Sequence, residues 1–286
     1  MSESGEEAPL RSAGRSDVGR TRRDNQDAHA EFESPSGERL WIVADGMGGH
    51  VGGATASKIC VEALGEVFVD SLDPPGRRLS RGLATANARI REAAELSPKL
   101  AGMGTTAVAL ALRGNRGWLG WVGDSRAYRA RGGVLEALSH DHSLVAEWVR
   151  AGVLEPAEAE THPRRNELLR ALGAAPEVEA ELRELEVRPG DRFLLCSDGL
   201  SSVVPESEIA AVVALEAPEL AAQKLVALAN ARGGPDNVTA VVVQVADREL
   251  GVTPRAGVPS RIGWLVAALA AGVAIYGVLS YAGFLE

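Results

Sequence analysis

The stretch 41-WIVADGMGGHVGG-53 joins an apolar run to a loop that is rich in glycine. The run ends on one carboxylate, Asp45, and five of the next eight residues are glycines. A short apolar run that ends at glycine is typical of a buried β-strand. Glycine-rich loops also cradle phosphates through backbone N–H groups, so a nucleotide site is one interpretation. The loop has neither the GxxxxGK[ST] nor the GxGxxG spacing, which argues against that interpretation.

The composition is that of a globular protein with a sizeable core. Of the 286 residues, 45% are hydrophobic and 24% are charged. The net charge of −9 argues against nonspecific nucleic-acid binding, which needs an excess of Lys and Arg. The two cysteines, Cys60 and Cys196, form no CxxC pair. Cys196 lies in the apolar run 193-FLLC-196, so we expect a small buried core residue.

The two ends of the chain differ in character. Residues 1–11 are polar and acidic without an apolar signal region, which predicts a disordered tail. Residues 262–285 contain no charged residue and suffice to cross the hydrocarbon core as one helix. The alternative is a buried core helix, but such helices are rarely apolar on every face. Residues 247–261 are rich in Gly and Pro and predict a flexible linker.

Charges around residues 262–285 predict an orientation. Arg255 and Arg261 precede the span, and only Glu286 follows it. The positive-inside rule then places the globular domain, residues 12–246, in the cytoplasm. We therefore expect a single-pass, tail-anchored protein of the cell inner membrane.

Short apolar runs within the domain predict strands. They cover residues 40–45, 106–112, 118–123, 192–198 and 239–245. The RGNRG between the second and third runs is a hairpin signal, and the GG within 124–138 predicts a further turn between strands.

Helical patterns cover about residues 53–70 and 79–96, and residues 140–175 predict an irregular insertion near the site. Antiparallel signals outnumber the alternation of strand and helix that a parallel sheet needs. We therefore expect an α+β fold of two stacked antiparallel sheets with helices outside them.

Five aspartates lie at the edges of the predicted strands, next to glycine or turn residues. They are Asp27, Asp45, Asp124, Asp198 and Asp236. A single aspartate in such a place is usually a turn former or a helix N-cap. Five of them suggest that strand ends converge and bring the carboxylates into one cleft, where they would repel one another. Mg²⁺ or Mn²⁺ would remove that repulsion, because these ions prefer oxygen ligands.

Seven short blocks occur in order along the domain. They are 22-RRDNQD-27, 45-DGMGGH-50, 104-GTT-106, 123-GDSR-126, 139-SHDHSLV-145, 197-SDGL-200 and 236-DN-237. Together they resemble the metal-dependent protein serine/threonine phosphatases of type 2C, in their bacterial form, over about residues 12–246. The resemblance implies a four-layer α-β-β-α sandwich with a two-metal centre between the sheets.

The resemblance also implies roles for individual residues. Asp45 would bridge both metal ions, and the Gly46 carbonyl would ligate the second. Asp198 and Asp236 would complete the coordination of the first ion, and Asp27 would hold the second ion or its waters. Asp124, with Asp198, would form a more weakly held third site. Arg22 matches the arginine that binds the substrate phosphate; its neighbour Arg23 is the alternative, and the spacing favours Arg22.

The implied reaction is hydrolysis of phosphoserine and phosphothreonine on proteins. Two metal ions lower the pKa of a bridging water, and the resulting hydroxide attacks phosphorus directly. An arginine fork and the metal ions balance the charge on the phosphoryl oxygens. Neither Cys60 nor Cys196 has the C-x5-R loop of a cysteine-based phosphatase.

Some positions depart from the family pattern. Met47 occupies the place where many eukaryotic relatives have a histidine that is a candidate general acid. His50 lies five residues beyond Asp45 and cannot inherit that role by alignment, so a metal-bound water is the alternative acid. Gln26 stands where some relatives have glutamate.

Two further groups of side chains admit two interpretations each. His140 and His142 could be a metal pair, but a structural role is favoured, with Ser139 or Asp141 capping a helix. Three arginines of the insertion are either solvated charges or contacts for acidic phosphopeptides: Arg164, Arg165 and Arg170.

The expected partners are phosphorylated proteins, serine/threonine kinases whose action the enzyme opposes, and the membrane; nucleic acid and nucleotides are not expected. A catalytically silent phosphoprotein-binding module is the competing hypothesis. Loss of a metal aspartate would support it, but all of them are present.

Overall fold

The computed structural model describes residues 9–247. The predicted transmembrane helix (262–285), residues 248–261 of the linker and residues 1–8 of the tail lie outside this range. Within residues 9–247, no helix has the length and apolar character needed to span a bilayer.

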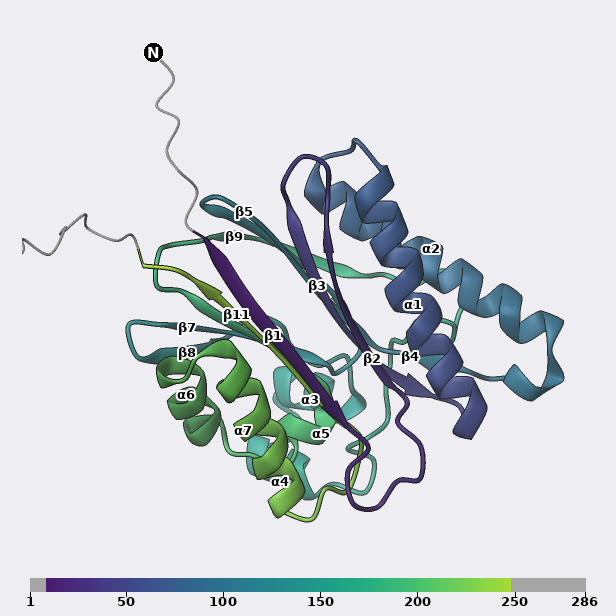
Figure 1. Cartoon of the computed structure of the whole chain (residues 1–286). Coiled ribbons are helices and arrows are strands. Elements are labelled where there is room, and N and C mark those ends of the chain that lie inside the picture. The colour runs from purple at the N-terminus through teal and green to yellow at the C-terminus, as the bar shows by residue number, and fades with distance from the viewer. Residues whose placement is uncertain (1–8, 248–286) are drawn as a thin grey trace, which may run out of the picture. The chain divides into compact units, whose positions relative to one another are not determined.

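Two antiparallel sheets form the centre of the domain (Figure 1). The first, here called the β11 sheet, contains in spatial order β1 (Leu10–Asp17), β11 (Val238–Val245), β10 (Arg192–Cys196), β7 (Arg126–Arg131) and β8 (Val134–Ala137). The second, here called the β3 sheet, contains β2 (Asp27–Glu33), β3 (Arg39–Met47), β5 (Ala107–Arg113), β6 (Arg116–Val122) and β9 (Glu181–Glu186), and the short β4 (Gly104–Thr105) pairs with β3. The predicted strands and both predicted turns are confirmed.

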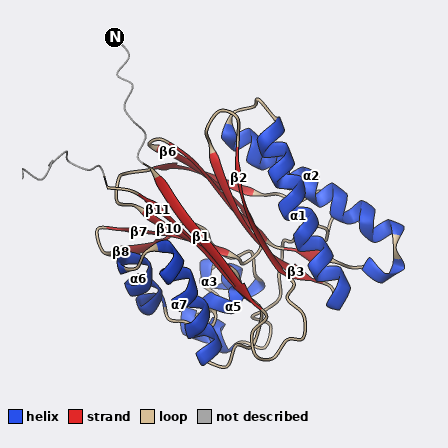
Figure 2. Cartoon of the chain, in the orientation of Figure 1, coloured by secondary structure: helices blue, strands red, loops and turns tan. Residues whose placement is uncertain are grey.

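Helices cover the outer face of each sheet (Figure 2). The long helices α1 (His50–Asp70) and α2 (Pro75–Leu96) pack on the β3 sheet, and a 3-10 turn, η1 (Pro98–Leu100), follows them. On the β11 sheet lie α5 (Asp198–Ser201), α6 (Glu206–Leu215) and α7 (Pro218–Ala231). The expected four-layer α-β-β-α sandwich is therefore confirmed for the described domain.

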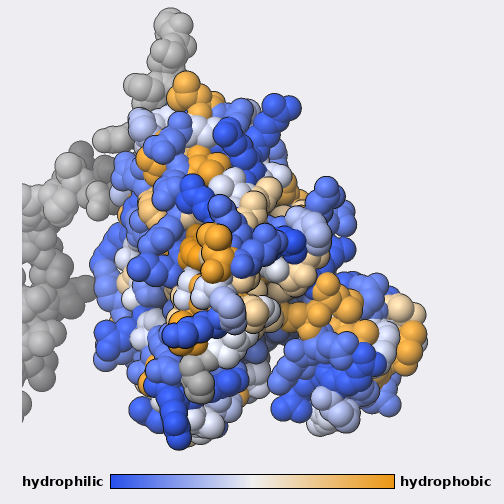
Figure 3. Space-filling view, turned by 90° about the vertical axis from the view of Figure 1, so that its right-hand side faces the viewer, coloured by the Kyte–Doolittle hydropathy of each residue, from blue (hydrophilic) through white to orange (hydrophobic). Residues whose placement is uncertain are grey.

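The alternating faces of β3 explain why the quoted stretch forms a central strand. Trp41 and Val43 point into the core between the two sheets. Leu40, Ile42 and Ala44 point the other way, into the core beneath α1 and α2. Because both faces are covered, the strand reads as a continuous apolar run rather than as an alternating one. The surface on the α1 and α2 side is mostly hydrophilic, and its apolar residues form small separate groups (Figure 3).

The first strand corrects the predicted tail. β1 begins at Leu10 and pairs with β11 along its whole length, so Leu10 and Arg11 belong to the sheet. The sequence 10-LRSAGRSD-17 carries few apolar residues because β1 is an edge strand with much of its surface exposed. Its polar composition hides it from a search for apolar runs.

The insertion predicted over 140–175 forms a strap with two short helices, α3 (Leu144–Arg150) and α4 (Pro156–Thr161). Isolated bridges tie it down between Ser143 and Leu168 and between Thr105 and Leu172. The cap of α3 is Ser143, whose hydroxyl accepts the Ala146 N–H. The expectation that Ser139 or Asp141 would cap this helix is therefore wrong.

Candidate metal centre

The five predicted aspartates converge at one end of the sandwich. Asp27 and Asp45 belong to the β3 sheet and lie directly opposite each other in the β2–β3 register. Asp198 follows β10 and Asp236 precedes β11, so both come from the other sheet. Asp124 lies in the turn that crosses from β6 to β7. The cleft therefore receives carboxylates from both sheets, as the sequence predicts.

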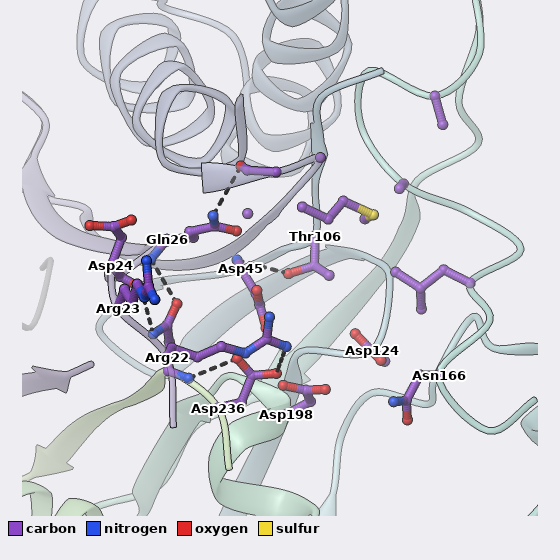
Figure 4. A pocket seen from close by; sticks show the side chains of 18 of the residues that line it. Arg22, Arg23, Asp24, Gln26, Asp45, Thr106, Asp124, Asn166, Asp198 and Asp236 are labelled. Atoms are coloured by element: carbon purple, nitrogen blue, oxygen red, sulfur yellow. Dashed lines mark hydrogen bonds and ion pairs between the residues drawn. The ribbon is translucent and has the colours of Figure 1, made fainter. Parts of the chain in front are cut away.

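Four of the five line an open cavity of about 530 Å³. Figure 4 shows Asp45, Asp124, Asp198 and Asp236 around it, with Arg22 reaching across from the loop before β2. Asp27 is not among the residues that line this cavity. Its Oδ1 atom is buried.

Two threonines fix the backbone of Asp45. Its N–H donates to Thr106 Oγ1 at 3.0 Å, and its carbonyl accepts the Thr106 N–H at 2.9 Å. The same carbonyl accepts the hydroxyl of Thr105 at 2.8 Å. Thr106 Oγ1 also lies 2.7 Å from the hydroxyl of buried Ser125, next to Asp124. These contacts explain the GTT block, whose role the sequence alone did not reveal.

The glycines after Asp45 allow close backbone packing. A Cβ atom on Gly46 would lie 2.1 Å from the Gly53 carbonyl oxygen, so only glycine lets α1 begin so near the strand end. Gly48 has φ of 111°, a conformation that favours glycine, and its added Cβ would lie 2.6 Å from the Met103 Cα. Gln26 holds this loop, because its Nε2 donates to the Gly49 carbonyl at 3.0 Å.

The electrostatics of the cluster fit a cation site. Burial, with repulsion from neighbouring carboxylates adding to it, raises the pKa of Asp124 to about 7 and that of Asp27 to about 6. The same causes raise the pKa of Asp198 and hold that of Asp45 well above its ordinary value. Oδ1 of Asp27 and Oδ1 of Asp198 are buried without a hydrogen-bond partner among residues 9–247. Divalent cations with oxygen ligands would satisfy these atoms and compensate the charge.

Arg22 lies in the cleft beside one of these carboxylates. Its Nη2 donates to Asp236 Oδ2 at 2.8 Å, and Asp236 Oδ1 accepts the Asn237 N–H at 2.9 Å. Arg23 also lines the cavity, but within residues 9–247 no ion pair ties it to a carboxylate of the cluster. The geometry thus places Arg22 at the carboxylate cluster.

Asn237 is a structural residue of the site that the sequence reading did not assign. Its Oδ1 accepts the Gln26 N–H, and its Nδ2 donates to the carbonyls of Val18 and Asp24. It therefore ties the loop that carries Arg22 to the start of β11. The DN block was the available signal, but only the fold shows what its asparagine contacts.

The strap forms another wall of the cleft. Asn166, Leu168 and Leu169 line the cavity. Beyond it lies a second cavity of about 740 Å³, and Asp124, Asn166 and Asp198 line both. Of the three arginines in the strap, Arg164 pairs with Glu167 and Arg170 reaches Glu181, whereas Arg165 lines the second cavity.

His140, His142 and Glu181 form a tight cluster away from the aspartates. Both Nε2 atoms lie 3.1 Å from Glu181 Oε1, close enough for the three residues to surround a metal ion. However, burial lowers the pKa of His142, and its Nδ1 accepts the Gly123 N–H at 3.1 Å. The neutral ring therefore carries its proton on Nε2, directed at Glu181, so Nε2 has no lone pair for a metal. The cluster is a hydrogen-bonded anchor.

The two cysteines are core residues. Cys60 and Cys196 are fully buried, and burial raises the pKa of each thiol to about 12. A thiol with so high a pKa is not a nucleophile at neutral pH. The side chain of His50 lies outside the described atoms, whereas its backbone begins α1.

Known proteins are similar to this chain in both sequence and fold. The serine/threonine protein phosphatase PstP of Mycobacterium tuberculosis is 43% identical over 249 residues, which cover 85% of this chain and 46% of that protein. This chain thus spans less than half the length of that relative. The serine/threonine phosphatase stp of Listeria monocytogenes is 37% identical over 238 residues, which cover 80% of this chain and 94% of that protein.

A solved structure of the catalytic domain of the serine/threonine protein phosphatase PstP, in complex with two manganese ions, matches with a TM-score of 0.75 and 39% identity. That match covers 83% of this chain and 99% of the other. The family model for Protein phosphatase 2C matches residues 14–231, which is more than half of the chain. The chain belongs to the protein phosphatase 2C family.

Proposed function

We propose that this chain is a metal-dependent protein serine/threonine phosphatase. The observation that carries the proposal is the meeting of buried carboxylates from two sheets with Arg22 in one open cleft. Such a cleft combines sites for cations with a donor for a phosphoryl group. The relatives named above are serine/threonine phosphatases, and they support the same activity.

The proposed cofactors are two Mn²⁺ or Mg²⁺ ions, with a weaker third ion at Asp124 and Asp198. Asp45, the Gly46 carbonyl, Asp198 and Asp236 would hold the two core ions, and Asp27 would support the second. Oxygen donors of this kind suit these cations, and the manganese-bound relative supports the assignment. Two such ions supply a water that is ionised near neutral pH.

The protein side chains then bind and orient the substrate. Arg22 presents guanidinium N–H groups to the phosphoryl oxygens, and its ion pair with Asp236 keeps that guanidinium in the cleft before the substrate binds. The cavity is open to solvent, so a phosphorylated side chain of another protein can enter it. A hydrolysis of this type needs no protein nucleophile, in accord with the buried, inert thiols of Cys60 and Cys196.

The test is hydrolysis of a phosphothreonine peptide by the purified chain with and without Mn²⁺. We expect turnover that requires the metal and that falls by more than about 100-fold in Asp45→Asn and in Asp198→Asn, since losing an outer-shell partner of a metal alone costs up to that much. Turnover that persists in chelator, or in both variants, would contradict the proposal. Tight binding of the phosphopeptide without turnover would favour a silent binding module instead.

We also propose that residues 262–285 anchor the enzyme in the inner membrane with its catalytic domain in the cytoplasm. The uncharged apolar run and the preceding Arg255 and Arg261 support this orientation. There the enzyme would oppose serine/threonine kinases. Membrane fractionation of cells that produce the full chain, followed by protease treatment from each side, tests it. A chain recovered entirely in the soluble fraction would contradict the anchor.

A further inference from the structure

Two buried hydroxyl groups reach Asp27 from the opposite sheet. Ser197 Oγ and Thr239 Oγ1 each lie 2.7 Å from Asp27 Oδ2. Both residues are fully buried; Ser197 follows β10 and Thr239 lies in β11, whereas Asp27 begins β2 of the β3 sheet. The carboxylate is therefore held across the sandwich rather than by its own sheet.

The direction of these hydrogen bonds is determined by the surrounding groups. An ionised carboxylate has no proton to donate, so both hydroxyls donate to Oδ2. Ser197 Oγ in turn accepts the Thr239 N–H at 3.0 Å. Thr239 Oγ1 lies 2.7 Å from Ser16 Oγ, from which it accepts.

Asn25 completes this chain of donors. Its Oδ1 accepts the Asp27 N–H at 3.2 Å, which fixes the orientation of the amide. The Nδ2 atom then points to Ser16 Oγ at 2.8 Å and can only donate to it. The hydrogen bonds are therefore donated in one direction: Asn25 donates to Ser16, Ser16 to Thr239, and Thr239 to Asp27.

The two carboxylate oxygens of Asp27 are thereby made unequal. Oδ2 accepts hydrogen bonds from two hydroxyl groups, whereas Oδ1 is buried without a hydrogen-bond partner among residues 9–247. The β2–β3 register places Asp27 opposite Asp45. β2 is an edge strand and Asp27 is its first residue, so within the described domain β3 is the one strand of its sheet that pairs with it there.

We infer that Ser197 and Thr239 are positioning residues of the metal centre, whose hydroxyls hold Asp27 Oδ2 and leave Oδ1 as the oxygen that faces the cation. The inference rests on the proposed metal-dependent function. Outer-shell partners of this kind orient a metal ligand, and their loss typically costs about 10- to 100-fold in metal affinity.

The experiment measures Mn²⁺ binding by calorimetry to the full chain after a chelator has stripped it. Thr239→Val keeps the shape of the side chain and removes the hydroxyl, and half-exposed Ser16 can then turn to water. We expect Thr239→Val to weaken Mn²⁺ binding at one site by about 10- to 100-fold. Thr239→Ser retains a hydroxyl, is the matched control, and should restore most of the affinity. Ser197→Ala should act in the same direction as Thr239→Val.

Melting temperatures of the metal-free variants separate positioning from folding. A purely structural role would lower these temperatures and leave the Mn²⁺ affinity of the folded protein unchanged, which would overturn the inference. If Thr239→Val fails to fold, Ser197→Ala decides by the same criterion. A wild-type chain that binds no Mn²⁺ would overturn the proposed function together with this inference. A wild-type chain that binds, beside variants that bind equally tightly, would overturn the inference alone.

Discussion

Arg22 is poised to exchange one partner for another. Its side chain is 56% exposed and its ion pair with Asp236 is solvent-accessible. Ion pairs of this kind contribute little net free energy, so a phosphate dianion can compete for the guanidinium at small cost.

Replacing Arg22 should weaken substrate binding more than it weakens the binding of the metal ions. We expect Arg22→Ala to lower kcat/KM for a phosphothreonine peptide by about 10- to 100-fold, mainly through KM, because the charge-assisted hydrogen bonds from the guanidinium to the phosphate are lost. The kcat/KM of Arg22→Lys should lie between the values of the wild type and of Arg22→Ala, since an ammonium keeps the charge but cannot make the bidentate contact. Arg23→Ala is the matched control from the same loop. A larger loss in Arg23→Ala than in Arg22→Ala would reverse the assignment.

For single residues, the sequence predicted which side chains have functional chemistry, but not which other residues hold those side chains in position. Asp45 and Asp198 follow apolar runs, so their position near strand ends can be predicted from local pattern alone. Thr106 and Asn237 contact residues far away along the chain, and no local pattern records such contacts. Only the pairing of the strands brings them to the site.

The strap is the element that connects the cleft to the rest of the β3 sheet. Glu181, at the start of β9, accepts hydrogen bonds from His140, His142 and Arg170 through one oxygen, Oε1. His142 also accepts the Leu169 N–H on its carbonyl, and Leu169 lines the cleft. One carboxylate thus anchors both ends of the segment that forms this wall.

Removing that anchor should loosen the wall without unfolding the domain. Glu181→Ala leaves the buried Nε2–H of His142 without its acceptor, which costs about 1–3 kcal/mol. We expect amide hydrogen exchange in residues 166–171 to rise by about tenfold or more and KM for a phosphopeptide to increase. The neighbouring variant Glu179→Ala removes only an exposed ion pair with Arg170 and should change neither quantity. Unchanged exchange in Glu181→Ala would show that the bridges alone hold the strap.

The strands of the two sheets show where apolar sequence patterns predict structure and where they fail. Strands β3, β5, β10 and β11 are buried on both faces, and their continuous apolar runs predict them well. β9 reads 181-ELRELE-186, with only Leu185 buried, because it is an edge strand. Edge strands carry charges that protect them from pairing with other chains, and this protection removes the apolar signal.

For the whole molecule, the metal cleft is a source of repulsion between the two sheets. Asp27 and Asp45 come from one sheet and Asp198 and Asp236 from the other. Without cations, the fold favours protonated carboxyls: the pKa is raised to about 6 for Asp27 and to about 7 for Asp124. In the unfolded chain both would titrate near 4. The folded state therefore binds more protons between about pH 4 and pH 7, and the free energy of unfolding falls as the pH rises through that window.

We expect the melting temperature of the chelator-treated chain to fall from pH 5 to pH 8, and the gain from added Mn²⁺ to widen over the same range, because the ion binds the ionised carboxylates. Differential scanning calorimetry at both pH values measures this.

Asp124→Asn removes one of the repelling groups, so it should raise the metal-free melting temperature at pH 8 and flatten the dependence of the melting temperature on pH. Asp70→Asn changes an exposed carboxylate at the end of α1 and should leave the slope as it is. A metal-free protein that is more stable at pH 8 than at pH 5 would show that the cleft carboxylates do not control the pH dependence. A steeper slope in Asp124→Asn would show that its charge stabilises the fold.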